Sequence, residues 1–413
     1  MKAEAEALSR AGRSFDRLLF GLRHTGTIPE IGLPQHAVRE FLMRLASVDS
    51  NNRFDATSIG AGEREGRVCS ALVHELHLGF AHGIGRSGNL TERQPKAVGC
   101  SILSEIANKL ALDAIRFLGI PGARAAMVVP VATGMALSLC LGAWRQTKAY
   151  AKFVVFLRID QKSCFKSILT AGFEPIIVDC IRESPSNDSL VTDLATLRLI
   201  LEQRHHEILA VLSATSGFAP RNPDDLVAVG ELCAEYGVKH LVNNAYGLQS
   251  PECRSRIEEA GAAGHIDAFV QSTDKNFLVP VGGSIVATFD APSLDIIASF
   301  YPGRASAVVD LPMNQISLAI TLNGWMADQQ TAFGARLFSR GVTGARVVPN
   351  GTSKSISSYE FVNFGSHASR QHCGYLNVAC ALGMSVHEID QLQRVLREET
   401  PKWALANTKG TSK

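Results

Sequence analysis

The chain carries a series of short apolar runs, separated by segments long enough for a helix, over residues 60 to 300. Fully apolar runs in this rhythm are typical of buried parallel strands joined by helical crossovers. The pattern therefore predicts an α/β domain built on a largely parallel sheet. The seven predicted strands are Met127–Val131, Phe153–Leu157, Pro175–Val178, Ile208–Leu212, Lys239–Val242, Ala268–Gln271 and Ser284–Ala287.

The pattern changes on both sides of this region. Before residue 60, helical segments alternate with loops, and an apolar stripe that includes Phe15, Leu18 and Leu22 lies beside arginines. Such a helix could dock on a partner or carry RNA. After Tyr301, strands at 316–322 and 345–348 and a helix at 390–399 predict a smaller α+β unit. We expect a helical extension over 1–60, a large domain over 61–303 and a small domain over 304–413.

Composition narrows the class of protein. The formal net charge of the 413 residues is +2, whereas a dedicated nucleic-acid-binding domain is usually strongly basic, so any RNA contact is expected to be a local patch. The nine cysteines contain no C-x-x-C pair and no secretory leader precedes them, which favours reduced thiols, no metal site and a cytoplasmic location. The apolar stretch 125–144 contains Pro130 and Gly134, so we interpret it as strand, turn and helix start rather than a membrane span.

The sharpest local signal is Lys275, which follows the strand 268–271 and precedes the motif Pro280-Val-Gly-Gly283 and another strand. A lysine at a turn between two buried strands is poorly solvated, which favours a neutral amine able to form an imine. A surface turn lysine is an equal alternative for this run alone.

A second strand ends in Leu241-Val-Asn-Asn-Ala-Tyr-Gly247. In pyridoxal enzymes of the aspartate aminotransferase type, the residue at this strand end faces the pyridine nitrogen and is commonly an aspartate. Asn243 is the candidate here, and its amide would give a milder electron sink. An asparagine that merely caps a turn is the alternative.

Two further strand ends carry polar groups. Thr133 and Gly134 follow the strand 127–131 and open a helix, whose backbone N–H groups could hold a cofactor phosphate. Gln161 follows the strand 153–157 in Arg158-Ile-Asp-Gln161, where ligand-facing residues of parallel sheets collect. Four strand ends thus direct polar groups to one crevice.

The run Gly83-Ile-Gly-Arg-Ser-Gly88 formally matches G-x-G-x-x-G, but no clear strand precedes it. An anion-binding loop fits better, because Arg86, Ser87, Gln94 and Lys96 offer donors that suit a phosphate ester. A solvated glycine loop is the alternative.

Taken together, the motifs resemble those of the O-phosphoseryl-tRNA:selenocysteinyl-tRNA synthase (SepSecS) family, over residues 15 to 400. This resemblance implies a fold-type I pyridoxal phosphate enzyme that is tetrameric and builds its sites at dimer interfaces. The strings that carry it are GEREGRV (62–68), HGIGRSG (82–88), QPKA (94–97), RIDQKSCFKS (158–167), VNNAYG (242–247), DAFVQS (267–272), DKNF (274–277), VPVGG (279–283) and YPGRASA (301–307).

The resemblance assigns roles residue by residue. It implies that Lys275 is the Schiff-base lysine and that Arg64 contacts the cofactor. Glu63 resembles the filter residue, whose charge repels a free α-carboxylate but tolerates the ester of an aminoacyl-tRNA. The residues implied to hold the phosphate of phosphoserine are Ser87, Gln94 and Arg304, with Arg86 in the same loop. The implied reaction eliminates this phosphate and adds selenium from selenophosphate.

Departures from the family accompany the matches. Two basic tRNA contacts of the family align with Thr25 and Ala262, which leaves Arg23 and Arg340 as the RNA-contact candidates. The family continues after residue 307 into a long interdomain helix, which this chain lacks. A pyridoxal-dependent lyase or desulfurase acting on free cysteine or selenocysteine, or a catalytically impaired RNA-binding relative, are the alternatives. Glu63 argues against the former, because a free amino acid normally needs an arginine for its carboxylate.

Overall fold

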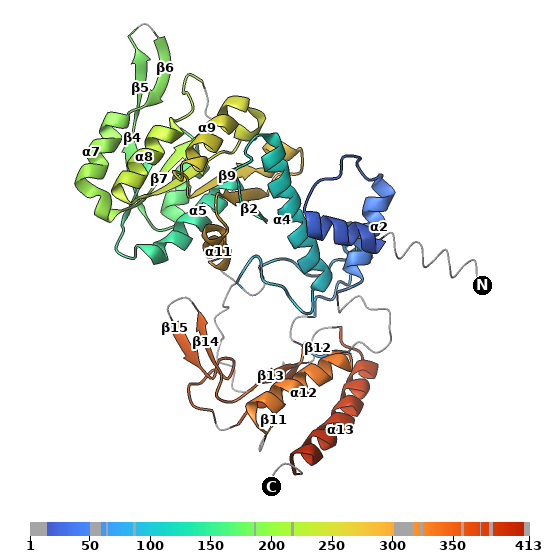
Figure 1. Cartoon of the computed structure of the whole chain (residues 1–413). Helices are drawn as coiled ribbons and strands as arrows, with labels where there is room; N and C mark the ends of the chain where they lie inside the picture. The colour runs from blue at the N-terminus through green and yellow to red at the C-terminus, as the bar shows by residue number, and fades with distance from the viewer. Residues whose placement is uncertain are drawn as a thin grey trace. The chain divides into compact units, whose positions relative to one another are not determined.

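The computed structural model describes residues 15–49, 59–62, 65–85, 88–185, 187–215, 219–300, 317–322, 325–356, 359–371, 373–379 and 383–408 (Figure 1). By its contacts the chain divides into two compact units. Unit 1 contains the described residues within 1–33, 84–92 and 101–305, and unit 2 contains those within 34–83, 93–100 and 306–413. Residues 61–83 and 93–100, which we expected in the large domain, therefore group with unit 2.

Unit 1 is built on a seven-stranded sheet in the order β2-β10-β9-β8-β7-β3-β4. Neighbouring strands are parallel except at β10, which is antiparallel to both β2 and β9. All seven predicted strands are present, with ends within two residues of the prediction, which confirms the α/β fold class. The strands are β2 (Ala125–Val129), β3 (Phe153–Leu157), β4 (Glu174–Val178), β7 (Ile208–Ala214), β8 (Lys239–Asn243), β9 (Ala268–Ser272) and β10 (Ser284–Thr288).

Apolar sequence explains why this sheet is central. Every residue of β7, β9 and β10 is buried, as expected for strands covered on both faces. One core cluster joins the sheet to α5 (Thr133–Trp144), α6 (Lys162–Thr170) and α11 (Ala291–Ser299). A second joins it to α4 (Val98–Leu118) and α9 (Pro251–Ala262), and a third to α7 (Leu194–Arg204) and α8 (Leu226–Tyr236).

The stretch 125–144 forms strand β2, a turn and helix α5, as predicted. Its apolar character follows from burial, because every α5 residue from Ala136 to Trp144 is buried. Within the described part of the chain, no helix combines the length and apolarity needed to cross a membrane.

Two features of unit 1 lie outside the sheet. Residues 15–25 are helical, and Leu22 of the predicted apolar stripe is buried. A hairpin of β5 (Cys180–Ser184) and β6 (Asn187–Thr192) follows β4 and was not predicted from the sequence.

Unit 2 has an α+β core, as the pattern after residue 301 predicts. Its antiparallel sheet has the order β11 (Ser317–Thr321), β16 (Tyr375–Ala379), β13 (Arg346–Val348). The sheet packs with α12 (Ala327–Ser339) and α13 (Val386–Thr408) around Phe333, Leu337 and Leu376. Ile59 and Ala61 belong to the same core, and the backbone N–H of Ala379 donates to the carbonyl of Ala61 (2.9 Å). This contact explains why an early segment joins the late unit.

The elements of unit 2 include several that the sequence did not indicate, among them α12, β16 and a second hairpin, β14–β15. In chain order they are α2 (Gln35–Ala46), β1 (Ile59–Gly60), α3 (Ala71–Leu76), β11 (Ser317–Thr321), α12 (Ala327–Ser339), β12 (Val342–Thr343), β13 (Arg346–Val348), β14 (Ser353–Ile356), β15 (Tyr359–Val362), β16 (Tyr375–Ala379) and α13 (Val386–Thr408).

Candidate active site

The carboxyl ends of parallel strands meet at one edge of the unit 1 sheet, and the predicted site residues Asn243 and Lys275 lie at or just after two of these ends. Asn243 is the last residue of β8, and its Cα pairs with that of Val270 on β9. Lys275 follows β9 on the short helix α10 (Thr273–Phe277). Ligands of open α/β sheets bind at this edge, so its side chains define the candidate site.

Lys275 lies between β9 and β10, as predicted, and its side chain is half-buried. Its Nζ atom lies 4.1 Å from the centre of the Tyr246 ring, a cation–π distance. Gln249 Nε2 donates to the backbone carbonyl of Lys275 (2.6 Å). The sequence did not single out Tyr246, although it lies three residues after Asn243 in the same turn.

Asn276 fixes the helix that carries the lysine. Its Nδ2 atom donates to the carbonyls of Ala245 (2.9 Å) and Ser272 (2.7 Å), which ties α10 to the turn after β8. The neighbouring Asn244 is fully buried, and its Oδ1 accepts a hydrogen bond from the Thr215 hydroxyl (2.6 Å). The turn motif after β8 therefore serves partly as a support for the lysine.

Glycine at 283 permits a close approach on the other side of Lys275. A Cβ atom at this position would lie 2.7 Å from Oγ1 of Thr273, closer than real Cβ contacts. Next to it, Ser284 Oγ donates to the carbonyl of Val131 (2.7 Å), which joins the start of β10 to the segment after β2. The Gly-Gly sequence before β10 thus brings the segments that follow β2 and β9 together.

Asn243 is buried, and both ends of its amide already have a partner. Nδ2 donates to Cys164 Sγ (3.3 Å), and Oδ1 accepts from the backbone N–H of Ala245 (3.2 Å). Burial raises the pKa of the Cys164 thiol to about 11, with the Asn243 hydrogen bond opposing the rise. Cys164 is therefore neutral at pH 7. A primary amide has a second N–H and a second lone pair, so Asn243 keeps capacity for one more ligand.

The start of helix α5 fits a phosphate group. Thr133 is its first residue, and the Oγ1 atom of this buried side chain has no hydrogen-bond partner among the described residues. The N–H groups of Thr133 and Gly134 lie in the first turn, where helix N–H groups lack the usual acceptor four residues earlier and attract anions. A Cβ atom on Gly134 would lie 2.9 Å from the carbonyl of Ser163, so glycine allows α5 to approach α6. An unpartnered donor at a helix N-terminus suits the phosphate of a cofactor.

Gln161 has a structural bond of its own. It is the N-cap of α6, and its side-chain oxygen accepts from the backbone N–H of Cys164 (3.0 Å). Its amide nitrogen is not used in this cap.

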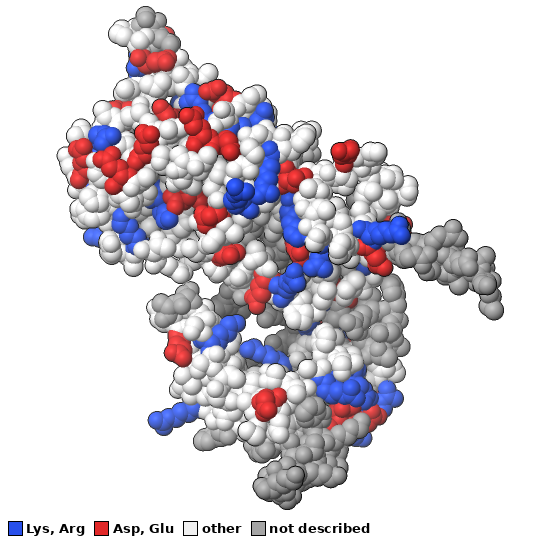
Figure 2. All heavy atoms as spheres, in the orientation of Figure 1, with Lys and Arg blue, Asp and Glu red and all other residues white. Residues whose placement is uncertain are grey.

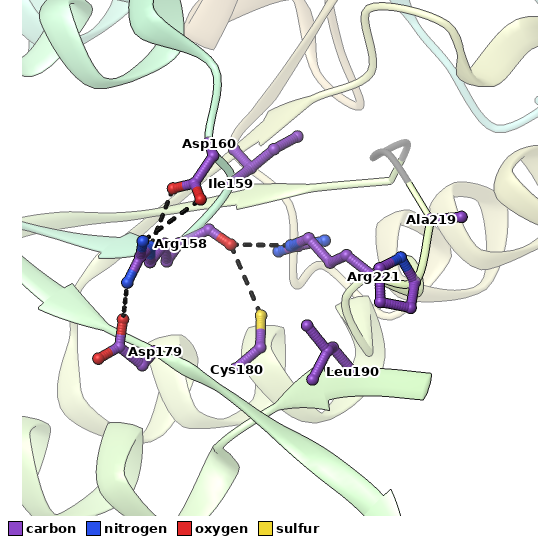
Figure 3. Close-up of a pocket in the computed structure, with 9 residues that line it drawn as sticks. Arg158, Ile159, Asp160, Asp179, Cys180, Leu190, Ala219 and Arg221 are labelled. Atoms are coloured by element: carbon purple, nitrogen blue, oxygen red, sulfur yellow. Dashed lines mark hydrogen bonds and ion pairs between the residues drawn. The ribbon is translucent and has the colours of Figure 1, made fainter. Parts of the chain in front are cut away.

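A cavity of about 580 Å³ lies at the carboxyl ends of β3 and β4 (Figure 3). The guanidinium of Arg158 in it is paired with Asp160 (2.9 Å) and Asp179 (2.8 Å), and that of the buried Arg221 with Asp224 (2.7 Å). Both positive charges are thus balanced within the protein, and the cavity does not offer a ready anion site. Figure 3 also shows Cys180 and Arg221 directed at the carbonyl of Arg158.

Most of the residues predicted to contact the substrate belong to segments that the structure does not describe. Glu63, Arg64, Arg86, Ser87 and Arg304 lie outside the described residues. Gln94 belongs to unit 2, where it is half-buried and its backbone carbonyl accepts from Ala97 N (2.9 Å). Lys96, which we had grouped with this loop, pairs with the buried Glu65 (2.5 Å).

Both predicted RNA contacts form ion pairs. In unit 1, Arg23 lies 3.1 Å from Glu105, and in unit 2 Arg340 pairs with Glu398 and Glu399. On the face of unit 1 drawn in Figure 2, basic and acidic side chains are interspersed rather than gathered by sign. Among the described residues, no cluster of three or more His, Cys, Asp or Glu could hold a metal ion, and all eight cysteines are free thiols.

Comparison with known proteins identifies the family. The sequence model of O-phosphoseryl-tRNA(Sec) selenium transferase, SepSecS, matches residues 48–310 and 307–400. The chain belongs to the SepSecS family. The two matched ranges overlap at residues 307–310. This is the position at which we expected the interdomain helix of the SepSecS family to be absent.

Two individual relatives and one solved structure support the assignment to the SepSecS family. The O-phosphoseryl-tRNA(Sec) selenium transferase of Caenorhabditis elegans is 46% identical over 438 aligned residues, which cover 95% of this chain and 90% of the relative. That of Dictyostelium discoideum is 36% identical, covering 91% of this chain and 92% of the relative. A crystal structure of the archaeal enzyme superposes with a TM-score of 0.66 at 26% identity, covering 95% of this chain and 98% of that one. The fold is therefore that of a SepSecS transferase, a fold-type I enzyme.

Proposed function

We propose that this chain converts O-phosphoseryl-tRNA(Sec) to selenocysteinyl-tRNA(Sec) with pyridoxal phosphate as cofactor and selenophosphate as selenium donor. Membership of the selenium transferase family, at 46% identity over most of the chain, is the observation that carries the proposal. The position of Lys275, a half-buried residue at the carboxyl edge of the sheet, supports it. We further propose a cytoplasmic homotetramer with sites at dimer interfaces.

The cofactor would bind at the carboxyl edge of the sheet. Thr133 and Gly134 would bind its phosphate through a free hydroxyl and first-turn N–H groups. Asn243 would face the ring nitrogen with its remaining amide capacity, and Gln161 and Arg64 would contribute further contacts. When bound, pyridoxal phosphate supplies the electron sink that makes loss of the substrate α-proton feasible.

The protein's own groups divide the remaining work. The Lys275 amine would hold the cofactor covalently and, once displaced by the substrate amine, move the α-proton. Arg86, Ser87, Gln94 and Arg304 would bind the phosphate that leaves, where preorganised positive charge stabilises the transition state. Glu63 would repel the carboxylate of free phosphoserine, and Arg23 and Arg340 would contact the tRNA.

Replacement of Lys275 by alanine tests this assignment. We expect Lys275→Ala to abolish formation of selenocysteinyl-tRNA, and borohydride treatment to attach the cofactor covalently to the peptide containing residue 275 in the parent protein but not in this variant. Lys166→Ala, at an exposed lysine on α6, is the control and should retain both properties. Turnover by Lys275→Ala, or labelling of another lysine in the parent, would refute the role of Lys275.

A further inference from the structure

Arg340 lies at the carboxyl end of α12, where two successive glutamates of α13 reach it. Its Nη2 atom lies 2.7 Å from Glu398 Oε2, and its Nη1 atom pairs with Glu399 Oε1. One turn earlier on α12, Arg336 Nε pairs with the second oxygen of Glu399 (3.2 Å). Glu399 therefore bridges two arginines, and Arg340 is held between two carboxylates.

The two carboxylates differ sharply in burial. The side chain of Glu399 is 2% exposed and that of Glu398 is 45% exposed. A buried carboxylate that loses its partners is left uncompensated, which is strongly unfavourable, whereas an exposed one is readily solvated by water. Glu399 is thus fixed to Arg340, while Glu398 can be exchanged.

The charges of these side chains explain why replacing Glu398 as the partner of Arg340 would favour the binding of a polyanion. The four side chains, two arginines and two glutamates, sum to zero formal charge, so the two carboxylates offset the attraction of Arg336 and Arg340 for an approaching polyanion. The hydrogen bond that Arg340 donates to Glu398, followed by the charges of both glutamates, raises the pKa of Arg340, so the guanidinium stays charged. Its planar fork of donors fits a phosphate as well as a carboxylate.

We propose that RNA binds at Arg340 by displacing Glu398, while Glu399 acts as a positioning residue that holds the guanidinium in place. The proposal rests on the proposed function, in which Arg340 contacts the tRNA. It adds that Glu398 competes with the RNA for Arg340 and that Glu399 holds Arg340 in position. The two neighbouring carboxylates then have opposite effects. Glu398 weakens RNA binding, and Glu399 strengthens it.

The test compares single substitutions in the full chain, with an unacylated selenocysteine tRNA transcript as the probe. Dissociation constants are measured by fluorescence anisotropy over a series of salt concentrations. Glu398→Gln should bind about two- to fivefold more tightly and make the slope of log Kd against log salt steeper by about 0.7 to 0.9. Glu399→Gln should bind more weakly than the parent, although it removes the same charge. Glu360→Gln, at an exposed carboxylate of β15, controls for that change of charge.

The results separate an effect of charge alone, a failure of the inference and a failure of the proposed RNA contact. If Glu398→Gln and Glu399→Gln both strengthen binding as Glu360→Gln does, charge alone acts and the inference is wrong. Because Glu398 is exposed, its variant should fold even if Glu399→Gln does not, which thermal unfolding will show. Arg340→Gln should weaken binding and reduce the salt slope by about one. If Arg340→Gln binds like the parent, the RNA contact in the proposed function fails; if it weakens binding but Glu398→Gln matches its control, the inference alone fails.

Discussion

Buried polar side chains at the carboxyl edge of the sheet fall into two groups. Thr215 donates to Asn244 within the protein, whereas Thr133 Oγ1 and Gln271 Nε2 have no partner among the described residues. A buried donor without a partner costs free energy in the folded protein. A bound ligand that supplies the missing hydrogen-bond acceptor would remove this cost.

Valine in place of threonine separates the two groups, because it removes the hydroxyl and keeps the shape. Thr133→Val should weaken pyridoxal phosphate binding about tenfold or more, since a hydrogen bond to a charged phosphate is lost. It should leave the unfolding free energy of the cofactor-free protein unchanged or slightly higher. Thr215→Val should instead lower that free energy by about 1–3 kcal/mol, because Asn244 Oδ1 loses its donor. Cofactor titration and urea unfolding measure both; equal cofactor affinity of Thr133→Val and the parent would contradict the phosphate site.

Individual residues were predictable from sequence only where a strand end fixes their position. Lys275 and Asn243 follow apolar runs whose ends meet at one edge, so their placement follows from the topology. The contacts of Tyr246 with Lys275 and of Cys164 with Asn243 depend on rotamers and on the packing of α6, which no periodicity records.

Among the strands, those with mainly apolar sequences were predicted, and those that mix polar with apolar residues were missed. The seven sheet strands consist mainly of apolar residues and were predicted to within two residues. The hairpins β5–β6 and β14–β15 were missed because their strands are exposed or half-buried and mix polar with apolar residues. Their pairing is a local event that needs no apolar run.

A short capping motif marks the start of α13, and its contribution to the stability of the protein can be measured. Ser385 and Glu388 form a capping pair, in which the Ser385 hydroxyl accepts from Glu388 N (3.3 Å) and Glu388 accepts from Ser385 N (2.9 Å). Arg67 also pairs with Glu388 (2.5 Å). Burial favours the neutral acid, but the hydrogen bonds from Arg67 and Ser385 outweigh it and lower the pKa of Glu388 to about 2.

A lowered pKa makes stability depend on acid in a definite direction. The stabilisation by Glu388 should be complete above its unfolded pKa of about 4.3 and should be lost as the pH falls towards 2. After allowance for screening by water, Glu388→Gln should lower the unfolding free energy by about 1–2 kcal/mol at pH 7 and by much less at pH 2.5. Urea unfolding at both values checks this, with Ser385→Ala as the partner in a double-mutant cycle. An equal loss at both pH values would mean that the charge of Glu388 contributes nothing.

For the whole molecule, the comparisons point to a segment absent from the middle of the chain. The family match is split into two parts that overlap at residues 307–310, and the alignment with the Caenorhabditis elegans relative spans 438 positions, although this chain has 413 residues. That alignment must therefore include positions with no counterpart here. The expected loss is the interdomain helix of the family, immediately after the proposed phosphate ligand Arg304.

Restoring this segment tests what it contributes. Burial of one large apolar side chain stabilises by roughly 1.5–3 kcal/mol, and a helix of several turns buries many, so its loss could equal the entire stability of a domain, about 5–15 kcal/mol. We expect the chain as written to be poorly soluble, to fail to form a tetramer and to have little activity. A version that carries the corresponding segment of the Caenorhabditis elegans relative should be tetrameric and active. Size-exclusion chromatography and selenocysteinyl-tRNA formation compare the two; a tetrameric, fully active short form would show that the fold-type I core works without this helix and that Arg304 needs no support from it.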